Sequence, residues 1–156
     1  MITDCYIKGR FDNGVGKCAV VIAEGVPKSE ERKVLHQVAW IVPAQWEYKG
    51  KVILADQYNC EILAATYALQ WCMEHDKQLV NIYANTSTAQ SWYCLQRFPE
   101  GRVMGACYSD MVLKYYEHMN AKDGKEMKER LYADYIPKKD ENEFNVLVNE
   151  IATKVK

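Results

Sequence analysis

The stretch CEILAATYALQWCMEH, residues 60–75, constrains the possible folds of this chain more than any other segment. It is rich in helix-forming residues, and Asn59 directly before it is a favourable N-cap. Its apolar residues occur around much of the helix circumference and not along a single stripe, so more than one side must be covered by other elements. We therefore expect a central helix that is buried on more than one side.

The segments around this helix predict an α/β domain with one mixed sheet. Three segments before it are typical of strands, at residues 1–7, 16–23 and 33–42, and FDNGVG predicts a hairpin turn between the first two. After it we expect a strand at 79–83, helices at 86–96 and 110–120, a strand at 130–136 and an amphipathic helix at 141–155. Three antiparallel strands followed by crossover-connected strands predict a five-stranded sheet flanked by helices.

Length and composition favour a single domain over residues 1–156, with a packed core. The hydrophobic fraction is 49%, and the chain contains eleven Tyr and four Trp. We expect most of the aromatic residues in the core and not on a base-stacking surface. No run reaches the roughly 18 apolar residues of a membrane span, and the start of the chain has no apolar leader, so we expect a cytoplasmic protein. The six cysteines form no CxxC pair, which predicts reduced and mostly buried thiols.

The formal net charge of −1 supplies no global argument for nucleic-acid binding. Any such surface must be local. The basic residues that occur close together in the sequence are Lys8 and Arg10, then Lys122, Lys125, Lys128 and Arg130, and finally Lys138 and Lys139. An ordinary solvated surface explains these groups without a ligand, so the charge pattern leaves the partner open.

Two segments resemble motifs of the ribonuclease H family. ITDC at residues 2–5 is similar to the first-strand motif YTDGS, which contains the first catalytic aspartate, here Asp4. NCEILAATYAL is similar to the start of the family's central helix, where a polar residue precedes ELxAxxxAL, and this places the catalytic glutamate at Glu61. The order of the predicted elements agrees with the family along nearly the whole chain.

Two further segments resemble the family but differ from it chemically. IYANTSTAQSW is similar to IYTDSxxAxxW, with Asn85 at the position of the third acid, and ENEFNVLVNEIA is similar to GNExADxLA, with Asn149 at the position of the fourth. The loop before the last helix also lacks the GH or AH pair that supplies a mobile histidine in many members.

The resemblance implies a metal-dependent ribonuclease that cleaves RNA in RNA/DNA hybrids. In the family four carboxylates hold two divalent cations, Mg²⁺ or Mn²⁺, which activate water and stabilise the leaving oxygen. With Asn at two positions the formal charge of the set changes from about −4 to about −2, so only weak metal binding is expected, through Asp4 and Glu61. Asp56 is our candidate for a substitute ligand, and Asp12, Asp140 and Glu150 are weaker ones.

Each candidate also has a purely structural explanation. Asp4 could end a strand, Glu61 could favour a helix start through the helix dipole, Asn85 could cap a helix, and Asn149 could belong to a solvated helix face. Three functions therefore stay open. The first is a catalytically impaired protein that binds a nucleic acid or a protein partner. The second is an active ribonuclease H, with a substitute acid or with Asn85 or Asn149 as engineered changes, and the third is a structural or assembly protein.

Overall fold

The computed structural model describes residues 1–120 and 129–156, and a five-stranded sheet forms their centre. Its strand order is β3-β2-β1-β6-β7. The strands β1 (Ile2–Asp12), β2 (Val15–Glu24) and β3 (Lys33–Val42) are consecutive and antiparallel, whereas β6 (Leu79–Ala84) and β7 (Leu131–Tyr135) continue the sheet in parallel with β1. The mixed sheet predicted from the sequence is confirmed.

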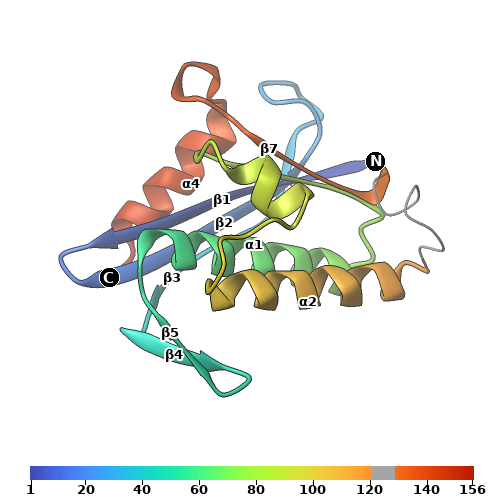
Figure 1. The fold of residues 1–156 in the computed structure, drawn as a ribbon. Coiled ribbons are helices and arrows are strands. Elements are labelled where there is room, and N and C mark those ends of the chain that lie inside the picture. Colours follow the sequence, from blue (N-terminus) through green and yellow to red (C-terminus); the bar gives the residue numbers. More distant parts are fainter. Residues whose placement is uncertain (121–128) are drawn as a thin grey trace.

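Helices cover both faces of this sheet (Figure 1). α1 (Gln57–Glu74) and α2 (Val103–His118) lie on one face, and α4 (Glu143–Lys154) lies on the other. Because side chains alternate along a strand, β1 contributes Cys5 and Ile7 to the core under α1 and α2, and Tyr6 to the core under α4. Four of the six cysteines are buried and the other two are half-buried, all as free thiols.

The hairpin between β1 and β2 has a two-residue turn of Asn13 and Gly14, both with positive φ. A second hairpin, β4 (Gln45–Tyr48) and β5 (Lys51–Leu54), was not predicted. Its turn residues Lys49 and Gly50 also have positive φ, but lysine is not among the residues that usually signal such a turn. The β4–β5 hairpin extends away from the main sheet below α1 (Figure 1).

Three helix predictions need correction. α1 begins at Gln57, because Asp56 and not Asn59 is the N-cap. Residues 86–96 form only one π-helical turn, η1 (Gln90–Cys94), before Pro99. α2 begins at Val103, well before residue 110; its N-cap Arg102 makes no side-chain capping bond, so the sequence contains no start signal there. A short 3-10 turn, η2 (Lys138–Asp140), precedes α4.

In the part of the chain that the structure describes, no helix combines the length and the apolar character needed to cross a lipid bilayer.

Gly9 is the point at which α1 contacts β1 most closely. A Cβ atom at this position would lie 2.2 Å from the backbone nitrogen of Glu61 and 2.5 Å from the carbonyl oxygen of Gln57. Only glycine therefore allows the first turns of the helix to lie directly on the strand. The contact places Glu61 above the second half of β1.

We predict that Gly9→Ala lowers the free energy of unfolding by about 3 kcal/mol, because backbone atoms of α1 must move away from the new methyl group. Gly50→Ala is the matched control: Gly50 has positive φ but no heavy atom within 4 Å of a Cβ, so about 1–2 kcal/mol is expected from backbone strain alone. Urea denaturation of both variants measures the difference. Equal losses would contradict the proposed close contact.

Candidate functional site

The candidate site lies where β6 ends beside β1. The two strands pair in parallel from Ile2 with Leu79 to Tyr6 with Tyr83. β6 ends at Ala84, whereas β1 continues to Asp12, and the same register would bring Lys8 level with Asn85. Ligands of open α/β sheets typically bind outside the carboxyl ends of parallel strands. We refer to this region, defined by Lys8, Glu61 and Asn85, as the crevice; the name marks its place beyond the end of β6 and not a measured hollow.

Glu61 is the buried carboxylate of the crevice. Its side chain is 3% exposed, and its Oε1 accepts hydrogen bonds from the hydroxyl groups of Tyr93 at 2.6 Å and Thr86 at 2.9 Å. Burial raises the pKa of Glu61 above its ordinary value, while the two hydrogen bonds and the positive charge of Lys8 act in the opposite direction. The carboxylate thus links α1 to η1 and to the segment after β6.

Asp4 does not meet Glu61 in this structure. Its Oδ1 accepts a hydrogen bond from Asn81 Nδ2 at 3.1 Å, near Glu24, and burial raises its pKa. The backbone of Glu61 contacts Gly9, five residues after Asp4 on the same strand, which corresponds to about 16 Å. The structure therefore does not bring together the two acids through which the resemblance implies metal binding.

The physical reason is the register of the first-strand motif. In the family motif that ITDC resembles, YTDGS, a glycine directly follows the aspartate. In this chain Asp4 is followed by Cys5, whereas the glycine under α1 is Gly9, preceded by Lys8. The residue beside Glu61 at the motif position is therefore a lysine and not an aspartate.

Asn85 and Asn149 both lie near Glu141, a carboxylate that was not among the predicted site residues. Asn85 Nδ2 donates to Glu141 Oε1 at 3.1 Å. Asn149 and Glu141 both line a surface hollow of about 310 Å³ beside α4. The side-chain oxygens of Asn85 and Asn149 are buried and have no hydrogen-bond partner among the described residues. Glu141 precedes the helix in a charged loop, so no pattern in the sequence distinguished it from its neighbours.

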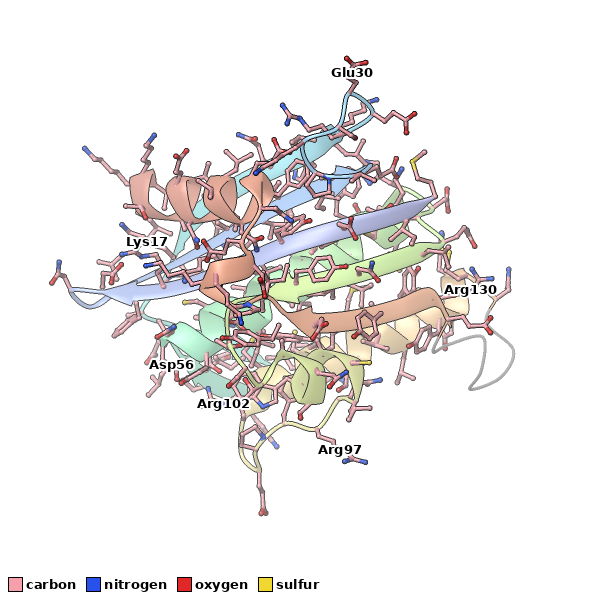
Figure 2. All side chains as sticks on the ribbon, turned by 90° about the horizontal axis from the view of Figure 1, so that it is seen from above. Lys17, Glu30, Asp56, Arg97, Arg102 and Arg130 are labelled. Atoms are coloured by element: carbon pink, nitrogen blue, oxygen red, sulfur yellow. The ribbon has the colours of Figure 1, made fainter. Side chains whose placement is uncertain are left out.

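Asp56, the candidate for a substitute ligand, has a structural role instead. Its Oδ1 accepts from the backbone N–H of Asn59 at 2.6 Å as the N-cap of α1, and its Oδ2 lies 3.4 Å from Arg102. Figure 2 shows Asp56 and Arg102 close together at this end of α1. Among the weaker candidates, Asp12 forms an ion pair with Arg10, Asp140 is exposed in η2, and Glu150 lines the hollow beside α4.

The donor atoms at the crevice do not fit a pair of divalent cations. Within residues 1–120 and 129–156, no three His, Cys, Asp or Glu side chains are grouped so that they could hold a metal ion. Glu61 uses one oxygen for two hydrogen bonds, and its charged neighbour is Lys8, a cation. Hard cations require several oxygen ligands with negative charge, and this group supplies too few.

A cation and two aromatic rings lie together at the first turn of α1. The guanidinium of Arg102 lies 5.5 Å from the ring centre of Tyr58 and 5.9 Å from that of Trp92, the residue before Tyr93. Tyr58 is 43% exposed, whereas Trp92 is buried, as expected for a core residue. No sequence pattern pointed to Arg102. Of the predicted basic groups, Lys138 and Lys139 are exposed in η2, and Lys122, Lys125 and Lys128 lie outside the described residues.

We predict that Glu61 makes stability depend on pH. A carboxyl with a raised folded-state pKa contributes its full stability below the unfolded value, and that contribution is lost as pH rises through the folded value. Glu61→Gln keeps an oxygen that accepts from Tyr93 and Thr86 but does not ionise. The stability of the variant relative to the unsubstituted chain should therefore increase as pH rises above 4.5. The increase should be about 1.4 kcal/mol for each pH unit by which the folded-state pKa of Glu61 exceeds its ordinary value. Urea denaturation between acidic and neutral pH tests this, and parallel profiles would contradict it.

Comparison with known proteins relates this architecture to solved structures only. No family model and no curated protein sequence matches the chain. LC11-RNase H1, isolated from compost by a metagenomic approach, has a TM-score of 0.63 at 12% identity, covering 97% of this chain and 93% of that one. In complex with an RNA/DNA hybrid, LC11-RNase H1 has a TM-score of 0.60 at 16% identity, covering 97% of both chains.

RNase H1 from the halophilic archaeon Halobacterium salinarum NRC-1 has a TM-score of 0.59 at 10% identity, covering 99% of this chain and 96% of that one. These similarities extend over nearly the whole chain and agree with the observed strand order and with helices on both faces of the sheet. The chain therefore has the ribonuclease H-like fold.

Proposed function

We propose that this protein binds an RNA/DNA hybrid at the crevice and does not cleave it by a two-metal mechanism. The observation that carries the proposal is the isolation of Glu61: it is the one family carboxylate at the crevice, with Lys8 as its charged neighbour. Asp4 lies farther back on β1, and the other two family positions are Asn85 and Asn149. The protein thus has the scaffold of a nuclease without its metal ligands.

The loss of cleavage follows from charge. A two-metal mechanism needs anionic oxygens that offset the cost of removing water from two divalent ions. Glu61 supplies one negative charge to the crevice, and Lys8 opposes it. We therefore expect no hydrolysis by this route, because the region does not supply the anionic ligands for two metal ions.

Hybrid binding is supported by a solved structure and by two features of this chain. A solved structure with this fold contains an RNA/DNA hybrid, and this chain covers 97% of it. Lys8 is a cation at the crevice, and at the first turn of α1 the exposed ring of Tyr58 lies next to Arg102, which also pairs with Asp56. Cations position a phosphate backbone, and aromatic rings pack on sugars and bases.

The partner in this proposal is a hybrid and not a DNA duplex because the solved structure of this fold with bound nucleic acid contains an RNA/DNA hybrid. The 2′-hydroxyl groups distinguish RNA from DNA, since they donate as well as accept hydrogen bonds. The side-chain oxygens of Asn85 and Asn149 have no partner within the described structure, but they are buried and offer no exposed acceptor to a ligand.

Binding and cleavage of a labelled 20-base-pair RNA/DNA hybrid test the proposed function. We expect binding to be retained in EDTA, and no cleavage with Mg²⁺ or Mn²⁺, because binding depends on protein cations and not on metal. The same duplex made of DNA should bind more weakly. Fluorescence anisotropy and gel electrophoresis of the same samples measure both properties. Cleavage that Glu61→Gln abolishes would establish an active ribonuclease, and absence of all binding would favour a protein partner or an assembly role.

The second prediction concerns the two amides. We expect the double variant Asn85→Asp and Asn149→Asp to remain unable to cleave the hybrid, because Lys8 still occupies the crevice. Asn85→Asp replaces the donor to Glu141 with a like charge, so the free energy of unfolding should fall by about 1 kcal/mol. Asn149→Asp alone is the matched control without that contact. Cleavage by the double variant would show that the two amides alone prevent catalysis.

A further inference from the structure

We infer that the ammonium group of Lys8 replaces the divalent cation in the crevice, as the partner of Glu61 and as the contact for one backbone phosphate. The phosphate contact rests on the proposed function; the replacement of the metal does not. Lys8 precedes Gly9, the residue under the backbone of Glu61, and follows Tyr6 on the same side of β1.

The surroundings of Lys8 leave its ammonium available. Its side chain is half-buried, and it forms no ion pair within 4.0 Å with any described residue. Glu61 is close enough for the charge of Lys8 to lower the pKa of that carboxyl, but the two side-chain hydrogen bonds of Glu61 come from the neutral hydroxyl groups of Thr86 and Tyr93. The ammonium therefore has free donors to offer a phosphate oxygen.

The charges around Lys8 are balanced without a metal ion. Lys8 and Glu61 cancel, and Asn85 and Asn149 add no charge. Glu141 adds one negative charge at the outer side of Asn85, while Arg10 is neutralised by Asp12 and donates to Thr153 on α4. The sum of these formal charges is about −1, whereas four carboxylates that bind two divalent ions carry about −4. Removing the lysine would leave Glu61 without a counter-charge.

Reversal of the charge at residue 8 tests the replacement. Lys8→Asp should bind one Mn²⁺ ion that the unsubstituted chain does not bind, and Lys8→Asp combined with Glu61→Gln should lose it. Electron paramagnetic resonance measures the bound ion, and Lys8→Met, an unbranched and uncharged side chain one atom shorter than lysine, is the control. A Lys8→Asp variant that is folded by circular dichroism and binds no Mn²⁺ would overturn the inference.

Two readouts on Lys8→Met remain if Lys8→Asp does not fold. The pKa of Glu61, followed by ¹³C NMR, should rise when the positive charge is removed. Hybrid affinity should fall at least about tenfold, as expected for loss of a charge-assisted hydrogen bond, and the salt dependence should fall by about one counterion. Lys8→Arg should retain the affinity. An unchanged Glu61 pKa would overturn the replacement, and unchanged affinity would overturn the phosphate contact.

The proposed function and the inference can fail separately. If the unsubstituted chain binds no hybrid, the proposed function fails and the phosphate contact fails with it, while Mn²⁺ binding and the Glu61 pKa still decide whether Lys8 replaces the metal. If hybrid binding is strong and Lys8→Met leaves affinity and the Glu61 pKa unchanged, the proposed function stands and the inference is wrong.

Discussion

The contact between Gly9 and the backbone of Glu61 determines the geometry on which the other features depend. With no Cβ at Gly9, the first turns of α1 lie directly on β1, at a distance that a larger residue would prevent. This position brings the Glu61 side chain within reach of Tyr93 and Thr86, which belong to segments that follow β6. Gly9 therefore determines how closely α1 approaches the sheet, how far Glu61 is buried and that Lys8 lies near Glu61.

Much of the fold could be predicted because its signals are local. Residues 33–42 have the composition of a strand, and the observed β3 has those bounds. The apolar residues of α1 predicted a helix covered on several sides, and its neighbours are the sheet and α2. The β4–β5 hairpin and the start of α2 were missed because Lys49 is an unusual turn residue and Arg102 makes no capping bond. Their conformations depend on packing, as Gly105 against the ring of Phe98 illustrates.

The site was harder to predict because the residue of β1 that lies beside Glu61 is decided by a contact between segments that are distant in the sequence. Asp4 lies in a sequence that looks like the family motif, yet the structure places Gly9, and with it Lys8, under α1. A shift of four residues preserves the side on which a strand residue points, so the alternation of side chains could not reveal the error. The glycine after the motif position was the only local signal. Glu141 and Arg102 had no signal at all, because their roles arise from tertiary contacts with Asn85 and with Tyr58.

Retention of Glu61 in the proposed metal-free site has a structural explanation. A buried carboxylate without partners would be costly, whereas this one receives two hydrogen bonds and the field of a nearby lysine. Its oxygen joins α1 to η1 and to the end of β6, so the acid contributes to the architecture even when it holds no cation. An acid that connects three segments is constrained by packing, so the presence of Glu61 does not by itself require a metal-binding role.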